Sequence, residues 1–161
     1  MAINMEHQDF KTTQNIKDLL KDIGEASSLF YLYYYFNCKG WSIYKNYDEK
    51  GYDILLLNNN DGRKIKLEVK TRQRIISSSK NKNKVTHFTL TEIEKQNADF
   101  LIAYWFEYNY FFIVPTNNLM ETKSNENKLY KFIVSLNKSN EPNPESMKYK
   151  DKWNIITEKG T

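Results

Sequence analysis

The sequence predicts an α/β fold in which helices flank a central mixed β-sheet. Apolar residues recur at helical spacing in the first quarter of the chain, whereas residues 99–106 form a nearly continuous apolar run. In addition, two strand-like segments enclose a turn at residues 58–62. A helix, several strands, a second helix and more strands in this order are typical of a layered domain. We expect one domain over residues 1–161, with its core at about residues 13–136 and a C-terminal tail at residues 137–161.

The N-terminal helix is predicted from apolar positions that recur every three or four residues from Ile16 to Phe36. Asn37 and Gly40 mark its end, because both residue types are favoured where a helix terminates. Gly24 lies inside this pattern. It either divides the stretch into two helices or is tolerated within one, and the sequence leaves both alternatives open.

Three strands are expected after this helix, at residues 41–46, 52–58 and 64–71. The third alternates apolar and polar residues with a period of two, as a half-buried strand does. The Asp-Gly pair between the second and third is a strong turn signal, so these two strands should form a hairpin. Residues 72–84 then contain five basic residues and no acidic residue, which is typical of a surface loop.

Four further strands are expected at residues 87–90, 99–106, 110–115 and 129–136. The second of these should be buried on both faces and should pair with the third. A short helix is expected between the first two, because Thr91 and Glu94 have capping-box spacing. Near the C-terminus, we expect Trp153 and Ile155 to pack against the body of the domain.

Composition limits the classes of function that the chain can have. The net charge of +4 permits a polyanionic partner. The single cysteine, Cys38, excludes a disulfide framework and a cysteine-rich zinc site, and we expect it to be buried. No run of about 18 apolar residues occurs and the N-terminus lacks a signal-peptide core, so we expect a cytoplasmic protein with no membrane partner. No nucleotide cofactor is expected.

Asp53 begins a segment that is otherwise apolar. Aspartate is uncommon in strands, and it is costly to bury unless it is paired or binds a metal. Taken alone, the residue is most simply interpreted as an exposed acid at the end of a strand, where it caps the preceding turn. A functional interpretation therefore needs further residues near it.

Glu68 and Lys70 supply such residues, since they lie two apart on one strand and point to the same face. An isolated pair of this kind usually belongs to a solvated polar face. A hairpin through residues 58–62, however, would bring Asp53 to the level of Glu68 or Lys70. Two carboxylates at one place suit Mg²⁺, which lowers the pKa of a bound water. A neighbouring lysine can orient that water or stabilise the charge that develops on a phosphate.

Glu25 shares a helix face with Leu29, Leu32 and Phe36. A carboxylate on an apolar face has two explanations here. Either the residue belongs to a functional site, or it lies in the first turn of a helix that starts at Gly24, where the helix dipole favours an acid.

Residues 24–72 resemble the core of the PD-(D/E)xK nuclease superfamily, which includes type II restriction enzymes, archaeal Holliday-junction resolvases and related homing endonucleases. The pattern of that family is a helical Glu, a Gly-aromatic strand start, an Asp that opens a strand, and Glu-x-Lys on the next strand. The matching residues in this sequence are Glu25, Gly40-Trp41, Asp53 and Glu68-Val69-Lys70. Tyr52 departs from the pattern, because it stands where a proline precedes the Asp. Residues 86–106 resemble the helix-then-strand unit that completes the family's core sheet.

The resemblance implies a restriction-endonuclease-like fold and a Mg²⁺-dependent DNA endonuclease, with Mn²⁺ able to substitute. It implies that Asp53, Glu68 and the Val69 carbonyl bind the metal. Lys70 would be the catalytic lysine, and Glu25 would assist through a water or a second metal. The alternatives are a structure-selective nuclease of the junction-resolvase type and an inactive nucleic-acid-binding module of the same fold. A single site per chain favours a homodimer for cutting both strands of a duplex.

DNA contacts are expected from the basic segment that follows Lys70, namely from Arg72, Arg74, Lys80, Lys82 and Lys84. All three arginines of the chain, Arg63 included, fall at residues 63–74, and the planar guanidinium suits bidentate phosphate contacts. Such contacts release counterions and make binding salt-dependent. The alternative interpretation is a solvated loop in a lysine-rich chain.

Overall fold

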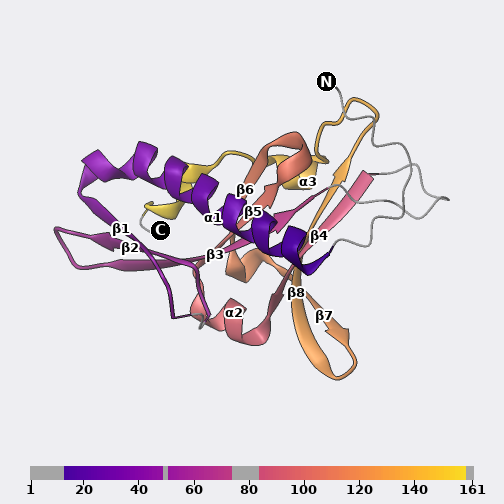
Figure 1. Ribbon diagram of the computed structural model, residues 1–161, viewed down its shortest axis with the longest axis horizontal. Coiled ribbons are helices and arrows are strands. Elements are labelled where there is room, and N and C mark those ends of the chain that lie inside the picture. Colours follow the sequence, from indigo (N-terminus) through magenta and orange to yellow (C-terminus); the bar gives the residue numbers. More distant parts are fainter. Residues whose placement is uncertain (1–12, 49–50, 74–83, 159–161) are drawn as a thin grey trace.

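The computed structural model describes residues 13–48, 51–73 and 84–158 and has the expected α/β architecture (Figure 1). Its α-helices are α1 (Gln14–Phe36), α2 (Glu92–Asn97) and α3 (Pro144–Met147). The central sheet contains β1 (Trp41–Lys45), β2 (Ile54–Asn58), β3 (Lys64–Arg72), β5 (Phe100–Trp105) and β6 (Tyr110–Pro115), in the spatial order β1-β2-β3-β5-β6. A second sheet contains β4 (Lys84–Thr91), β7 (Met120–Ser124) and β8 (Asn127–Leu136), in the order β4-β8-β7.

The central sheet is mixed, as predicted. β1, β2 and β3 form an antiparallel meander, in which the predicted hairpin pairs Ile54 with Leu67. β3 and β5 run parallel, and the chain between them passes through β4 and α2, because parallel neighbours need a long crossover connection. β5 and β6 pair as an antiparallel hairpin, which confirms the predicted pairing of these two strands.

Helix α1 is one continuous helix that contains Gly24 in its interior. A Cβ atom at Gly24 would collide with Oγ1 of Thr71 on β3, so only glycine permits the helix to approach the sheet this closely. The helix begins after Thr13, whose hydroxyl accepts a hydrogen bond from the Ile16 N–H, and it does not restart at Gly24. Glu25 therefore lies in the middle of a helix, and its interpretation as a first-turn acid is wrong.

Two hydrophobic clusters fill the two faces of the central sheet. Under α1, Leu32 and Phe36 pack against β3 residues such as Leu67 and Val69. On the opposite face, Phe88 and Leu90 of the second sheet pack in a cluster with Leu101, Ala103 and Trp105 of β5. β5 is thus buried on both faces, as its apolar run predicted. The second sheet is a layer that was not predicted from the sequence, which indicated a central sheet flanked by helices.

The C-terminal segment docks onto the α1 side of the molecule. Trp153 and Ile156 are buried members of the cluster under α1, whereas the predicted anchor Ile155 is only partly buried. Cys38 is exposed, contrary to expectation, because it lies in a 3-10 turn that follows α1. Within the described residues, no helix is both long and apolar enough to span a membrane.

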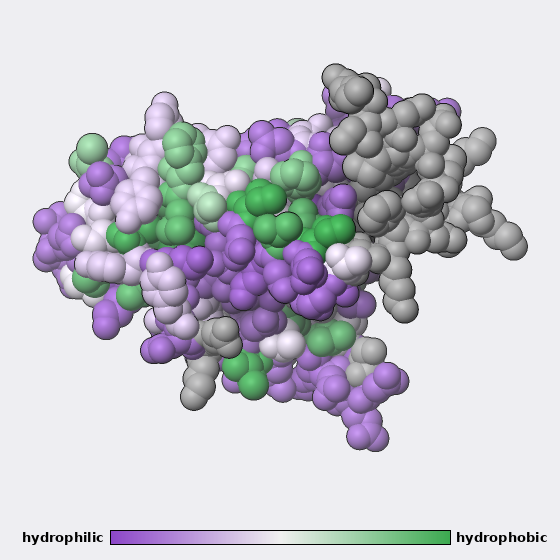
Figure 2. Space-filling model, viewed as in Figure 1, coloured by the Kyte–Doolittle hydropathy of each residue, from purple (hydrophilic) through white to green (hydrophobic). Residues whose placement is uncertain are grey.

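The outer surface of α1 is only partly polar. Its large exposed apolar side chains are Leu19, Ile23, Phe30, Tyr33 and Tyr34. Figure 2 shows hydrophobic patches beside hydrophilic areas on the face of the molecule along which α1 runs. The helix therefore buries one side against the sheet and presents a mixed surface on the other.

Candidate active site

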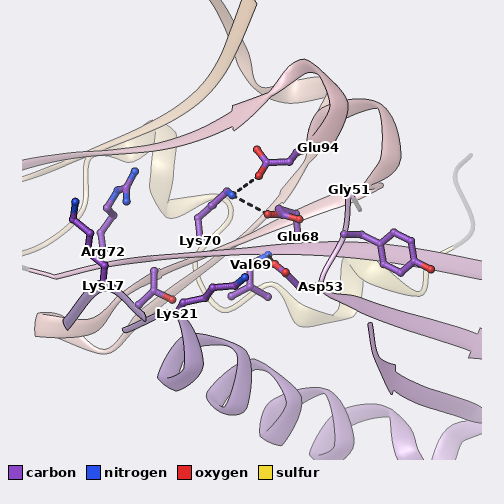
Figure 3. A pocket seen from close by; sticks show the side chains of 11 residues that line it. Lys17, Lys21, Gly51, Asp53, Glu68, Val69, Lys70, Arg72 and Glu94 are labelled. Atoms are coloured by element: carbon purple, nitrogen blue, oxygen red, sulfur yellow. Dashed lines mark hydrogen bonds and ion pairs between the residues drawn. The ribbon is translucent and has the colours of Figure 1, made fainter. Parts of the chain in front are cut away.

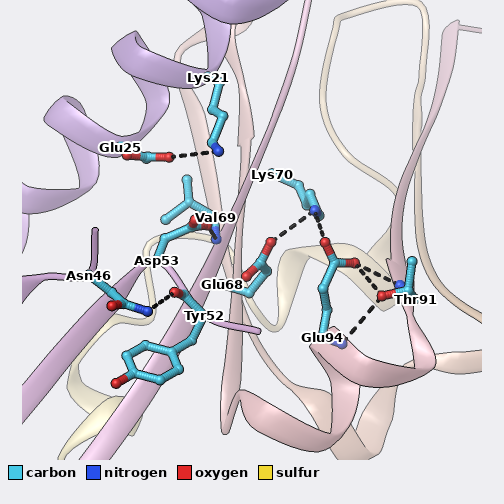
Figure 4. Close-up of polar contacts among 10 residues, drawn as sticks. All are labelled: Lys21, Glu25, Asn46, Tyr52, Asp53, Glu68, Val69, Lys70, Thr91 and Glu94. Carbon is cyan, nitrogen blue, oxygen red and sulfur yellow. Dashed lines mark hydrogen bonds and ion pairs between the residues drawn. The ribbon is translucent and has the colours of Figure 1, made fainter. Parts of the chain in front are cut away.

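Asp53, Glu68 and Lys70 meet at the end of the β2–β3 hairpin (Figure 4). The paired register ends with Ile54 opposite Leu67, and Asp53 is the residue just before β2, so Asp53 lies beside residues 67–69 of β3. The Asp53 N–H donates to the Leu67 carbonyl over 2.8 Å, and Oδ2 of Asp53 accepts a hydrogen bond of 2.8 Å from the Val69 N–H. The backbone of β3 thus fixes the carboxylate of Asp53.

The alternation of β3 places Glu68 and Lys70 on the face that lies away from α1. Leu67 and Val69 point into the cluster under α1, so the residues between and after them point to the opposite face. In the parallel register, Glu68 stands beside Leu101, which belongs to the cluster on that opposite face. The carboxylate of Glu68 is consequently buried, with the whole residue 5% exposed.

Lys70 lies between two carboxylates rather than one. Its Nζ is 2.8 Å from Oε1 of Glu68 and 2.7 Å from Oε1 of Glu94 (Figures 3 and 4). Glu94 belongs to α2, and its second oxygen, Oε2, accepts hydrogen bonds from the N–H of Thr91 over 2.7 Å and from the hydroxyl of Thr91 over 3.0 Å. The predicted capping box is confirmed, and its glutamate also contacts the candidate site.

Asp53, Glu68 and Lys70 carry charge in a poorly solvated place. Burial raises the pKa of Glu68 to about 7, and the charge of Asp53 adds to this shift. Burial also raises the pKa of Asp53, although the hydrogen bond from Val69 opposes the shift. For Lys70, burial alone would lower the pKa, but the carboxylates of Glu68 and Glu94 outweigh it, so the pKa is raised. Lys70 therefore stays protonated, whereas ionising Glu68 and Asp53 carries an electrostatic cost.

This arrangement fits a hard divalent cation. A nearby positive charge lowers the free-energy cost of holding two neighbouring carboxylates ionised in a buried place. The N–H and C=O of one strand residue point to the same side, so the Val69 carbonyl faces Asp53 as the Val69 N–H does. Within the described part of the chain, no three His, Cys, Asp or Glu side chains are placed to hold one metal ion. A cation here would rely on Asp53, Glu68, backbone oxygen and water, which suits Mg²⁺, an ion that keeps several of its waters.

Glu25 lies apart from the contacts of Lys70. Its carboxylate projects from α1 and forms ion pairs with Nζ of Lys45 at 3.1 Å and Nζ of Lys21 at 3.7 Å. The residue is only 5% exposed, and its negative charge contributes to the raised pKa of Asp53. The structure therefore brings three of the four predicted site residues together and places Glu25 in a neighbouring ion-pair cluster.

A cleft of about 270 Å³ opens at the site (Figure 3). Its charged lining residues are Lys17, Lys21, Asp53, Glu68, Lys70, Arg72 and Glu94. Lys17 and Lys21 lie one turn apart on α1, so both reach the same side of the cleft. These two lysines and the contact of Glu94 with Lys70 were not predicted from the sequence. The only sign of Lys17 and Lys21 in the sequence was that they lie four residues apart on the predicted helix, before Gly24.

The residues predicted to bind DNA are distributed unevenly. Arg72 lines the cleft and donates from Nε to the His87 carbonyl over 3.0 Å. Lys84 begins β4 outside the cleft lining, and its Nζ donates to Oδ1 of Asn140 over 2.6 Å. Arg74, Lys80 and Lys82 lie outside the described residues.

Arg63, the remaining arginine, serves the C-terminal segment. Its guanidinium donates to the Thr157 carbonyl over 3.0 Å and lies over the Trp41 ring, 5.0 Å from the centroid. The clustering of the three arginines in sequence therefore does not produce one arginine cluster at the cleft.

Comparison with solved structures shows the fold: the chain has a restriction-endonuclease-like α/β fold, as the resemblance implied. The solved structure of a bacterial homing endonuclease, I-Ssp6803I, matches with a TM-score of 0.59 and 20% sequence identity, over 87% of this chain and 91% of that chain. Hjc, a Holliday junction resolvase from the archaeal hyperthermophile Archaeoglobus fulgidus, matches with a TM-score of 0.46 and 15% identity, over 68% of this chain and 83% of that chain. Neither a protein-family model nor a curated protein sequence matches the chain.

Proposed function

We propose that the protein is a metal-dependent DNA endonuclease that hydrolyses phosphodiester bonds. The observation that supports this most is the convergence of Asp53, Glu68 and Lys70 at one end of a hairpin, where both acids are poorly solvated and Glu68 pairs with Lys70. The fold shared with a homing endonuclease agrees with this activity. Buried acids of this kind cost stability, so a purely structural role gives no reason for them.

In this proposal Asp53, Glu68 and the Val69 carbonyl hold Mg²⁺, or Mn²⁺ in its place. When bound, the cation supplies a water of lowered pKa and neutralises charge on the phosphate. Lys70 is protonated, since its pKa is raised, so it acts as a hydrogen-bond donor to the attacking water or to a phosphate oxygen and not as a base. Glu25 acts on Asp53 through its charge and through the lysines that it holds, Lys21 and Lys45.

The basic side chains of the cleft are the proposed contacts for the phosphates next to the scissile one. Lys17 and Lys21 reach the cleft from α1, and Arg72 reaches it from β3. Contacts from Arg74, Lys80, Lys82 and Lys84 remain part of the prediction from the sequence. Each chain carries one site, so cleavage of both strands of a duplex calls for a homodimer.

The proposal is tested by incubating the purified protein with supercoiled plasmid and with a four-way DNA junction, in Mg²⁺ or in EDTA. We expect cleavage in Mg²⁺ only, and loss of cleavage in Lys70→Ala. Lys64→Ala is the matched control, because Lys64 is an exposed lysine at the other end of the same strand. Cutting of the junction alone would indicate a structure-selective nuclease. Salt-dependent DNA binding without any cleavage would indicate an inactive binding module and contradict the proposal.

A further inference from the structure

Glu94 connects helix α2 to the amine of Lys70 through a fixed carboxylate. One oxygen, Oε1, is 2.7 Å from Nζ of Lys70. The other, Oε2, accepts from both the N–H and the hydroxyl of Thr91, and the Glu94 N–H donates back to that hydroxyl over 3.3 Å. The carboxylate thus has little freedom to rotate, and a group bound to Oε1 is held at one position.

The two carboxylates that contact Lys70 are not equivalent. Glu68 contacts Nζ over 2.8 Å, but it lies near Asp53 in the site (Figure 4) and is one of the residues proposed to bind the cation. An oxygen engaged with a cation is a weaker partner for an ammonium group, because the two positive charges repel each other. Glu94 lies on the far side of Nζ, on α2, so its contact with Lys70 does not compete with the cation.

A lysine side chain also needs a partner to hold its position. Its ammonium group is a point charge on a flexible four-carbon stem, and ordering that stem costs conformational entropy. Nζ of Lys70 and the Glu94 carboxylate are both largely shielded, with side chains 23% and 24% exposed. A charge-assisted hydrogen bond in such a place is among the stronger polar contacts in proteins.

We propose that Glu94 is a positioning residue that holds the Lys70 ammonium group beside the scissile phosphate while Glu68 is engaged with the cation. This inference rests on the proposed nuclease function, since the position of Lys70 matters only if it acts on a substrate. It adds a charged residue from α2 to a site otherwise built from β2 and β3. The competing possibility is that Glu94 only caps α2.

Two substitutions separate positioning from capping. In Glu94→Gln, only one of the two terminal positions is an acceptor, so the side chain cannot accept from Thr91 at one position and from Lys70 at the other, although glutamine remains a good capping-box residue. In Thr91→Ala, the hydroxyl of the cap is lost, but the backbone N–H of residue 91 still donates to Oε2 and the Glu94–Lys70 contact stays. We expect Glu94→Gln to lower the single-turnover cleavage rate about 10- to 100-fold with the KM for plasmid DNA nearly unchanged. Thr91→Ala should cleave at nearly the wild-type rate.

A measurement without turnover tests the contact directly. In ¹⁵N-lysine-labelled protein, the ammonium signal of Lys70, assigned by its loss in Lys70→Met, should be observable in EDTA and should persist when Mg²⁺ is added. In Glu94→Gln, we expect this signal to broaden or disappear when Mg²⁺ is added. Full cleavage by Glu94→Gln together with a persistent ammonium signal would overturn the positioning role. If cleavage by the wild type requires Lys70 but Glu94→Gln cleaves as fast as the wild type, the positioning role of Glu94 is wrong and the nuclease function stands. A wild type that cuts no DNA overturns the nuclease function, and the role of Glu94 falls with it.

Discussion

The backbone N–H of Val69 donates a hydrogen bond of 2.8 Å to Oδ2 of Asp53, so the strand that carries Glu68 and Lys70 also holds the third residue of the site. This contact makes the placement of Asp53 a consequence of β2–β3 pairing rather than of a flexible loop. An asparagine at this position keeps an acceptor oxygen for Val69 and loses only the negative charge. Asp53→Asn therefore tests the negative charge of Asp53 while the hydrogen bond from Val69 is kept.

Glu68→Gln should make the metal-free protein more stable than the wild type at pH 8. The pKa of Glu68 is raised from 4.5 to about 7 in the folded state. A carboxyl with a raised pKa binds its proton more tightly after folding, so its stabilising contribution is full below 4.5 and is lost as the pH rises through 7. Because glutamine stays neutral, we expect a gain of about 1–3 kcal/mol in the free energy of unfolding at pH 8 and little difference near pH 4.

Urea unfolding in EDTA at both pH values measures this difference. Glu107→Gln is the control, because Glu107 is an exposed acid outside the cleft lining and should show no comparable gain at pH 8. A Glu68→Gln protein that is less stable than the wild type at pH 8 would contradict the burial penalty assigned to this carboxylate.

Divalent cations should stabilise the wild-type protein and not the variants that lack a site carboxylate. A ligand that binds only the folded state at about 100 times its Kd adds about 2.7 kcal/mol to the free energy of unfolding. Thermal unfolding with and without Mg²⁺ or Mn²⁺ measures this effect as a rise in Tm. An equal rise in the wild type and in Asp53→Asn would show that the cation binds elsewhere.

Gly24→Ala should destabilise the protein, although alanine favours helices. The added Cβ collides with Oγ1 of Thr71, and we expect a net loss of about 1–3 kcal/mol in the free energy of unfolding. Thr71→Ala removes the hydroxyl and should recover much of this loss in the double variant, which a double-mutant cycle from urea unfolding would detect. Purely additive effects would show that the helix and β3 adjust independently.

Lys17→Ala with Lys21→Ala should weaken DNA binding in a salt-dependent way. Each lost phosphate contact lowers the slope of log K against log salt by about 0.9 for duplex DNA, so we expect a change of about 2. Binding in EDTA, where cleavage does not occur, measures the slope. The matched control is Lys64→Ala with Lys152→Ala, since both are exposed and lie outside the cleft lining. An unchanged slope in the α1 variant would exclude these lysines as phosphate contacts.

The parts that the sequence predicted well are those fixed by local pattern. The Asp-Gly turn and the period-two alternation of β3 set the hairpin register, and this register brings Asp53 beside the part of β3 that carries Glu68. Glu94 was predicted only as a capping residue, because its contact with Lys70 depends on how α2 packs after the crossover through β4. Local pattern carries no information about such a contact.

The remaining differences also arise from tertiary packing. The interior position of Gly24 follows from the contact with Thr71, which no helix propensity anticipates. The second sheet was missed as a layer, since β4 and β8 have the same strand pattern whether they join the central sheet or pair with each other. The pairing of Glu25 with Lys45 likewise joins residues of α1 and β1 that are distant in sequence.

Single-turnover cleavage of supercoiled plasmid in Mg²⁺ by the wild type and by Asp53→Asn tests the proposed function most directly. Asp53→Asn keeps the acceptor for Val69, so circular dichroism and urea unfolding should show an intact fold. We expect the wild type to cut and the variant to lose at least about 100-fold in rate, as removal of one charged group from a preorganised site does. A folded Asp53→Asn protein that cuts at the wild-type rate would show that this site does not carry the activity.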